Sequence, residues 1–298
     1  GDGLIHSVIY RTYYKNGVYD FSDAVKYVKD IVSEYDIAYY NQETPTGDDS
    51  IAYSGYPMFY TPSAYVDAMR AVGFNTVSLA SNHSLDKGEK GILNTIKYFK
   101  TTDILYSGMS DSETDRNNFI IKEKNNITYT MLSYTTITNG LNVPAGKSYL
   151  LNKYDKEQVK KDIEAVRDKV DVLIVAMHWG VEYINMPNDE EKEIAEYLSS
   201  LGVDIVIGNH PHILQPITKI GDTIVMYSLG NFISNQYGGS NGDWNKLIGF
   251  MATLDITKTV SKDNEVNMTF DNLGGELIFT KYKGNPVTTA VHSGHTVI

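Results

Sequence analysis

Residues 203–212 read Val-Asp-Ile-Val-Ile-Gly-Asn-His-Pro-His, and this stretch decides the fold. The apolar run 205–207 is typical of a strand buried on both faces of a parallel sheet. In open α/β sheets, ligands bind beyond the carboxyl ends of the strands. His210 and His212 lie there, in a turn stiffened by Pro211, and they point to the same side if the backbone is extended. They can chelate one metal ion or divide between two; a histidine turn without a metal is the alternative.

The same order, an apolar run followed by a side chain that can bind a metal, occurs at four more places. In chain order, these side chains are Asp2, with His6 four residues later, Glu43 after the run 36–40, Asn82 and His83 after 76–80, and His178 after 171–177. Each run alone has an ordinary structural explanation. Their joint occurrence at successive strand ends predicts one pocket, built from distant parts of the chain, in which oxygen and imidazole donors hold a catalytic metal.

The chemistry of each residue type indicates a role in that pocket. The carboxylate of Glu43 can bridge two cations, and Asn82 offers a neutral oxygen ligand. The adjacent His83 can donate a proton to a leaving group. Glu182 lies four residues after His178 and can orient it or bind substrate. Asp86, three residues before Glu89, is interpreted as a helix cap and not as a ligand.

The first two-thirds of the chain alternate helical and strand-like patterns, as α/β proteins do. The predicted helices cover residues 21–34, 61–72, 86–100, 155–170 and 187–201. A hairpin is expected over 119–134, with Asn125-Asn126 at its turn. From about residue 214 onward the pattern is only of strands, which we expect to complete a second sheet. We find no linker, so residues 1–298 are interpreted as one domain; His292 and His295, in a Gly/Ser-containing tail, have no expected role.

Composition excludes several classes of function. The 298 residues include 26 Lys and Arg against 37 Asp and Glu, for a net charge of −11, which argues against a nucleic-acid partner. There is no cysteine, so disulfides, thiolate metal sites and cysteine nucleophiles are excluded. No run approaches the roughly 20 apolar residues of a membrane helix. The chain begins Gly1-Asp2 without Met, which we interpret as a trimmed product whose targeting segment lies outside the sequence.

Six motifs in order resemble a known protein family. They are Gly-Asp at 1–2, Asn-Gln-Glu-Thr-Pro at 41–45, Ser-Asn-His-Ser-Leu-Asp-Lys-Gly at 81–88, His-Trp-Gly-Val-Glu at 178–182, His-Pro-His at 210–212 and Ser-Leu-Gly-Asn-Phe at 228–232. This series, which spans Gly1 to about Asn235, resembles the capsule-synthesis protein CapA family of poly-γ-glutamate biosynthesis. That family is similar to the calcineurin-like metallophosphoesterases.

The resemblance implies a fold and a site. It implies a four-layer α/β/β/α sandwich of two mixed sheets, with two divalent ions (Mn, Fe or Zn) at one edge. By motif, the implied ligands are Asp2, Glu43, Asn82, His178, His210 and His212, with His83 as the catalytic histidine and with His6 and Glu182 as further candidates for metal or substrate. In the wider superfamily, the first motif is usually Asp-Xaa-His and the second carries a bridging Asp. Here His6 follows Asp2 by four residues, and Glu43 takes the second position.

The resemblance also implies a place of action. Members are typically bacterial and work on the extracellular face of the cell membrane behind an N-terminal anchor, together with membrane capsule-synthesis machinery. The leading hypothesis is a metal-dependent hydrolase-like protein in anionic capsule production, in which a metal-activated water attacks a phosphate ester or an amide-like carbonyl. A non-catalytic module that binds or exports the polymer, and a general phosphoesterase, are the alternatives.

Overall fold

The computed structural model describes residues 1–236, 244–283 and 285–291, and two central sheets dominate it. The first sheet has the order β15-β1-β4-β7-β8, and every neighbouring pair is parallel. Its strands are β1 (Asp2–Gly3), β4 (Tyr39–Gln42), β7 (Thr76–Ser78), β8 (Leu105–Ser107) and β15 (Asn231–Ile233). Their carboxyl ends therefore share one edge, and each of the motif segments in the first half of the chain follows one of them.

The second sheet is mixed and has the order β13-β14-β12-β11-β10-β9. Its strands are β9 (Lys122–Lys124), β10 (Ile127–Thr135), β11 (Val172–His178), β12 (Ile205–Asn209), β13 (Ile217–Ile220) and β14 (Thr223–Met226). The four inner strands are parallel, and β9 and β13 are antiparallel edge strands. The parallel pairing of β11 with β12 places His178 directly opposite Asn209.

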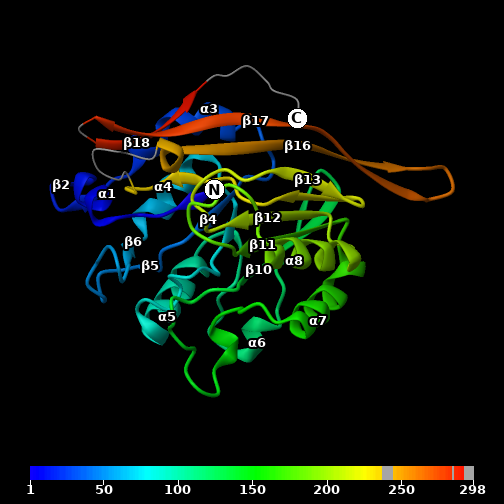
Figure 1. The fold of residues 1–298 in the computed structure, drawn as a ribbon, viewed down its shortest axis with the longest axis horizontal. Helices are drawn as coiled ribbons and strands as arrows, with labels where there is room; N and C mark the ends of the chain where they lie inside the picture. Colours follow the sequence, from blue (N-terminus) through cyan, green and yellow to red (C-terminus); the bar gives the residue numbers. More distant parts are fainter. Residues whose placement is uncertain (237–243, 284, 292–298) are drawn as a thin grey trace.

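Helices cover the outer face of each sheet, which gives the four layers (Figure 1). Against the first sheet pack α1 (Ser7–Thr12), α2 (Ser22–Val25), α3 (Lys29–Val32), α4 (Ala64–Val72) and α5 (Gly88–Phe99). Against the second pack α7 (Lys156–Val166) and α8 (Asp189–Ser200), while the short α6 (Glu113–Arg116) lies nearby. Successive side chains of β11 point to opposite faces of the second sheet. Leu173 and Val175 pack in the core under the helices, whereas Ile174 packs in the core that faces the first sheet. The four-layer α/β/β/α class expected from the sequence is confirmed, although the first sheet is wholly parallel and not mixed.

The strand-rich end of the chain does more than complete the second sheet. β13 and β14 do join that sheet, and β15 joins the first. The remaining strands, β16 (Ile248–Val260), β17 (Val266–Lys283) and β18 (Asn285–Val291), form a separate antiparallel sheet. The hairpin of β16 and β17 projects from the side of the molecule (Figure 1). The expectation of a single second sheet is therefore wrong for β15, which pairs with β1, and for the strands after residue 247, which pair with each other. His292 and His295 lie outside the described residues.

Local signals explain where several elements begin and end. Asn188 and Glu191 form a capping box at the start of α8, and Asp155 caps α7. Gly73, at φ +118°, ends α4. The expected hairpin forms, with Asn125 and Asn126 both at positive φ.

One predicted helix is interrupted. Over 21–34 the chain forms α2, a 3-10 turn η1 (Lys26–Val28) and α3 in place of a single helix. Three further 3-10 turns occur in the described ranges: η2 (Ser148–Leu150), η3 (Arg167–Lys169) and η4 (Trp244–Leu247). Two small ribbons complete the fold, β2 (Tyr14–Lys15) with β3 (Val18–Tyr19), and β5 (Thr46–Gly47) with β6 (Thr61–Pro62). None of the helices in the described residues has the length and apolarity needed to cross a membrane.

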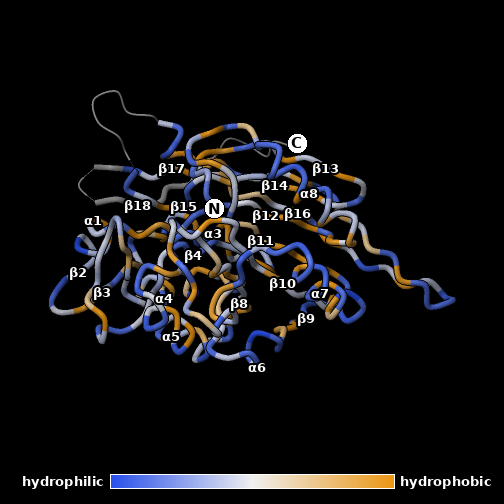
Figure 2. Tube along the Cα trace, turned by 60° about the horizontal axis from the view of Figure 1, so that its bottom comes forward, coloured by the Kyte–Doolittle hydropathy of each residue, from blue (hydrophilic) through white to orange (hydrophobic). Residues whose placement is uncertain are grey.

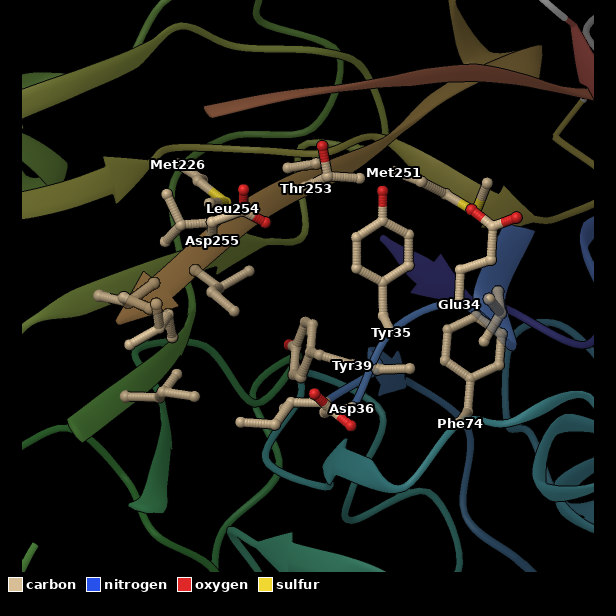
Figure 3. A pocket seen from close by; sticks show the side chains of 18 of the residues that line it. Glu34, Tyr35, Asp36, Tyr39, Phe74, Met226, Met251, Thr253, Leu254 and Asp255 are labelled. Carbon is tan, nitrogen blue, oxygen red and sulfur yellow. The ribbon is translucent and has the colours of Figure 1, made fainter. Parts of the chain in front are cut away.

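Apolar segments run through the centre of the molecule, and hydrophilic segments form most of its periphery (Figure 2). The layer between the sheets contains a cavity of about 520 Å³ beneath β16. Figure 3 shows Tyr35 and Tyr39 on one side of it and Met226, Leu254 and Asp255 on the other. None of the six predicted ligands lines this cavity, so the donor residues expected from the sequence lie elsewhere.

Candidate metal centre

All six predicted ligand residues converge at the edge where the carboxyl ends of the two sheets meet. Asp2 lies in β1, Glu43 follows β4, and Asn82 follows β7, all from the first sheet. His178 ends β11, and the turn after β12 carries the remaining two, from the second sheet. The six side chains Asp2, Glu43, Asn82, His178, His210 and His212 are all buried. We call this set the donor cluster.

Three groups of donor atoms within the described residues are compact enough to hold a cation, with all atoms of a group within 4.8 Å of one another. The groups are Glu43, His178 and His210; Asp2, Glu43 and His212; and Glu182, His210 and His212. Glu43 belongs to two of the three, as a bridging carboxylate does. Asn82 joins the cluster through its Oδ1 atom, which lies 3.0 Å from Nε2 of His178.

The turn that carries both histidines has an unusual backbone. His210 and His212 have φ values of +98° and +60°, in the left-handed region. Gly208 leads into the turn, where a Cβ would lie 1.9 Å from the carbonyl oxygen of Tyr227. The close approach of β12 to that backbone therefore requires glycine. Backbone strain of this kind is typical of functional sites.

Hydrogen bonds from neighbouring side chains fix several members of the donor cluster. Asn41 donates through Nδ2 to Oδ1 of Asp2 at 2.9 Å, and the same atom lies 3.4 Å from Nδ1 of His178. Nδ1 of His212 lies 3.1 Å from Oδ2 of Asp2 and 3.0 Å from Oδ1 of Asn231. The two sheets are thus joined across the site, and side chains behind the imidazoles of His178 and His212 set the orientation of these two rings.

Other donor atoms have no hydrogen-bond partner in the described structure. Both carboxylate oxygens of Glu43 are buried without one, as is Nδ1 of His210. Oε1 of Glu43 lies 3.5 Å from Nε2 of His212 and 3.9 Å from Nε2 of His178. A buried carboxylate without hydrogen bonds is costly unless it is paired or coordinates a metal. The residues present therefore fit a divalent cation.

The pKa values of the cluster follow from burial and from its crowded charges. Burial raises the pKa of Glu43 well above its usual value, although His212 opposes the change. Burial lowers the pKa of His178 well below its usual value, and burial with the charge of His212 lowers that of His210 to about 4. Near pH 7 these two imidazoles are therefore neutral, which is the form that binds metals.

His212 and Asp2 behave differently because they face each other. Burial acts to lower the pKa of His212, but the charge of Glu43 and the hydrogen bond and charge of Asp2 outweigh it and raise the pKa to about 9. For Asp2, burial acts to raise the pKa, but the hydrogen bond and charge of His212 outweigh burial, so the pKa falls below its usual value. In the metal-free protein these two groups form a charged pair.

His83 lies beside the cluster and is held by Asp86. Its Nδ1 atom lies 2.8 Å from Oδ2 of Asp86, which also accepts a hydrogen bond from the backbone N–H of Phe59 at 2.6 Å. The ring of His83 packs edge-on against Phe59. The interpretation of Asp86 as a helix cap is wrong: α5 begins at Gly88 after Lys87, and the carboxylate of Asp86 points to His83 instead.

The two further candidates differ in position. Glu182 is exposed, yet its carboxylate groups with His210 and His212 at the mouth of the cluster. His6 belongs to none of the three donor groups in the described structure. Its Nδ1 atom accepts a hydrogen bond from the backbone N–H of Asn235, and its ring packs against Phe59.

Sequence reasoning missed Asn41 and underrated Asn231. Asn41 lies in β4, two residues before the predicted ligand Glu43. Asn231 is the last residue of the Ser-Leu-Gly-Asn run, which we expected only to shape the pocket wall. Both are buried amides, Asn41 near the carboxyl end of β4 and Asn231 at the start of β15. That position was a usable signal for Asn41, but its contact with two groups from distant strands is not visible in the sequence.

This architecture, a four-layer α/β/β/α sandwich with a buried Asp, Glu, Asn and His cluster at the edge of its sheets, is metallophosphoesterase-like in its fold. The chain belongs to the bacterial capsule synthesis protein family PGA_cap, whose sequence model matches residues 1–236. The capsule biosynthesis protein CapA of Bacillus anthracis is 32% identical over 175 residues, which are 57% of this chain and 43% of that protein. The PGA biosynthesis protein CapA of Bacillus subtilis (strain 168) is 31% identical over 179 residues, 57% of this chain and 45% of that protein. The matched segment thus spans less than half of each relative.

Comparison with solved structures supports the fold. A putative 5'-nucleotidase from Staphylococcus aureus, in complex with alpha-ketoglutarate, matches with a TM-score of 0.54 and 13% identity over 98% of this chain and 53% of that chain. A calcineurin-like phosphoesterase from Bacillus subtilis matches 68% of this chain and 65% of that chain at 16% identity, with a TM-score of 0.40. At these identities, the first match shows a shared fold and nothing finer.

Proposed function

We propose that the chain is a metal-dependent hydrolase that acts in the biosynthesis of an anionic capsule polymer, poly-γ-glutamate. The observation that carries the proposal is the carboxylate of Glu43, buried without a hydrogen bond among imidazoles from the other sheet. Membership of the PGA_cap family supports the link to capsule synthesis. The chemistry of the donor set supports the link to hydrolysis.

The donor cluster would hold two divalent cations. Glu43, His178 and His210 would hold one, and Asp2, Glu43 and His212 the other, with Asn82 completing the set. Mixed carboxylate, amide and imidazole donors suit Mn, Fe or Zn. Glu43 would then lie between two cations, and its lack of a hydrogen bond in the metal-free protein would be explained.

In this proposal, residues of the chain protonate the leaving group and hold the ligand side chains in position. A bound divalent cation supplies Lewis-acid activation of water and polarises a phosphoryl or carbonyl oxygen. Asp86 can accept the Nδ1 proton of His83 and orient the ring, so that the doubly protonated imidazole would give its Nε2 proton to the leaving group and keep the Nδ1 proton on the Asp86 side. Asn41 and Asn231 fix the directions of Asp2 and His212. The burial of these groups keeps bulk water away and strengthens each electrostatic contact.

The test compares His210→Gln with His6→Gln, because His210 is buried and His6 half-buried but only His210 belongs to the donor groups. Each protein is dialysed against Mn²⁺ or Zn²⁺, its metal content is measured by mass spectrometry, and a panel of phosphoesters and γ-glutamyl amides is assayed. We expect the wild type and His6→Gln to hold metal and hydrolyse at least one substrate, and His210→Gln to lose both. Metal-free wild-type protein would refute the proposal. Metal binding without turnover of any substrate would favour the non-catalytic, polymer-binding role.

We also propose that the protein works at the extracellular face of a bacterial membrane, behind an N-terminal anchor and beside membrane capsule-synthesis machinery. Family membership is what supports this location. Protease treatment of intact cells tests it: an extracellular protein is digested before the cells are lysed, and a protein protected until lysis contradicts the location.

A further inference from the structure

We propose that Lys246 is the residue that selects an anionic chain for the donor cluster, by binding a carboxylate of the substrate next to the reacting group. The inference deepens the proposed function, on which it rests for the identity of the reacting site. Lys246 lies in the turn η4, is half-buried, and carries a positive charge near a site otherwise rich in acidic groups.

The lysine is fixed in place by two contacts. Its Nζ atom lies 3.7 Å from the centre of the Tyr183 ring, a cation–π contact. Its backbone carbonyl accepts a hydrogen bond from Nδ2 of Asn231 at 2.9 Å. Oδ1 of the same Asn231 contacts His212, so one amide ties the lysine to the donor cluster.

Tyr183 is fixed as firmly. Its backbone N–H donates to the carbonyl of Pro211 at 2.8 Å, inside the histidine turn, and its hydroxyl accepts from Nε2 of Gln236 at 3.2 Å. Its ring lies 6.1 Å from that of His212. Tyr183 therefore contacts the ammonium group of Lys246 and also lies close to the ring of His212, which places the ammonium near the donor cluster.

The charge balance leaves this ammonium available. Within the described ranges, no carboxylate forms an ion pair with Lys246, whereas neighbouring acidic groups are either in the cluster or, like Glu182, at its mouth. A substrate with several carboxylates would be repelled by these acids and by the net charge of −11. A positioned lysine beside the site, with no ion pair to the part of the chain that the structure describes, would offset that repulsion for one carboxylate of the substrate.

The rim next to Tyr183 favours a carboxylate chain with methylene spacers. Val181, Ile184 and Met186 are 52%, 50% and 58% exposed, on the same short segment as Tyr183 and Glu182. Large apolar side chains exposed together mark a binding surface. γ-Linked glutamate alternates two methylene groups with each carboxylate, so it offers apolar contact and charge in turn.

The experiment measures binding of a synthetic γ-linked oligoglutamate by isothermal titration calorimetry. Lys246→Met removes the charge at nearly constant length, Lys246→Arg retains it, and Lys160→Met on α7 is the matched control in the outer helical layer. We expect Lys246→Met to weaken binding by about tenfold, Lys246→Arg to remain within a few-fold of wild type, and Lys160→Met to be unchanged. An oligomer with amidated carboxylates should bind the wild type as weakly as the charged oligomer binds Lys246→Met.

Each titration is run with Mn²⁺ and with EDTA, so that failure of this inference and failure of the metal chemistry are distinguishable. Equal affinity of the wild type and Lys246→Met overturns the role of Lys246, whatever the metal content. No binding of the oligomer to a wild-type protein that holds metal also overturns it and leaves the metal site standing. A tenfold effect in EDTA as well as in Mn²⁺ supports Lys246 even if hydrolysis is never observed.

Discussion

Glu43 has unusual surroundings for a carboxylate. Its carboxylate is buried, its two oxygens lack hydrogen bonds, and its pKa is raised because burial disfavours the charge. A group with a raised pKa in the folded state destabilises the fold as the pH rises above the unfolded value. Such a residue is a cost to the metal-free protein, and a bound cation removes that cost.

Glu43→Gln should therefore separate stability from metal binding. In EDTA at pH 8, we expect the variant to melt at the same temperature as the wild type or about 2 °C higher, because a neutral amide replaces a carboxyl group whose charged form is disfavoured by burial. With excess Mn²⁺, the wild type should gain stability and the variant should not. Differential scanning calorimetry measures both. A variant that melts lower in EDTA but keeps the full gain from Mn²⁺ would contradict this view of Glu43.

The lowered pKa of His6 predicts how the stability of the metal-free protein changes as the pH falls. Burial lowers its pKa to about 4, with the carbonyl of Leu4 opposing and the charges of His212 and His83 assisting. The folded state favours the neutral ring, so its contribution to stability is complete above pH 6.5 and is lost as the pH falls towards 4. Between pH 8 and pH 5 this group alone accounts for about 2 kcal/mol. In urea unfolding, the free energy of unfolding of His6→Gln should fall less between pH 8 and pH 5 than that of the wild type, by that amount. Equal falls in the two proteins would contradict the prediction.

Asp86→Asn tests the positioning of His83. An amide in place of the carboxylate no longer favours a proton on Nδ1, so we expect turnover of a substrate found in the panel to fall by about 10- to 100-fold. Metal content should be unchanged, because neither residue is in the donor groups. Steady-state kinetics with parallel metal analysis gives the answer. A loss of bound metal in Asp86→Asn would show that Asp86 acts through the metal site.

The convergence of the donor residues could be predicted because all but Asp2, which lies in β1, come at or after the end of an apolar strand, and strand ends share an edge in a parallel sheet. The contacts and roles of the individual side chains could not be predicted from the sequence. Whether His6 reaches the cluster depends on the packing of Phe59 and on the backbone of Asn235, far away in the sequence. The same is true of Asp86, whose spacing from Glu89 fits a cap but whose side chain contacts His83.

At the scale of elements, α8 shows how strongly a local signal acts. Its capping box satisfies backbone N–H groups at both Asn188 and Glu191, and the helix leads into β12 and the histidine turn. Over 21–34, by contrast, the local pattern did not produce one continuous helix. Val25, Val28 and Val32 are buried as the periodicity predicts, but β-branched residues favour helix only weakly, and the segment tightens into a 3-10 turn at its centre.

Asn188→Ala should destabilise the protein by about 1 kcal/mol, since it removes the side-chain acceptor of the capping box. The exposed Glu193 in the same helix provides a control, and Glu193→Ala should remain within about 0.5 kcal/mol of wild type. Urea midpoints measured at constant m-value compare the two. Equal effects of the two substitutions would mean that the cap does not stabilise α8.

At the scale of the whole molecule, the site depends on how two sheets meet. Oγ atoms of Ser78 and Ser133 lie 2.7 Å apart between the sheets, and Nδ2 of Asn209 donates to the hydroxyl of Tyr39 at 2.8 Å. Such contacts fix the distance across which the donor cluster forms. The alternation of β and α patterns predicted the class of fold, but it could not predict the third sheet, because an antiparallel pattern does not name its pairing partner.

The central claim is that ligands from both sheets enclose cations at one edge. The most direct measurement is an anomalous difference map from crystals of the protein soaked in Mn²⁺. The account predicts peaks within bonding distance of Glu43, one shared with His178 and His210 and the other with Asp2 and His212. A map with no peak at this cluster, or with manganese bound only elsewhere on the molecule, would contradict it.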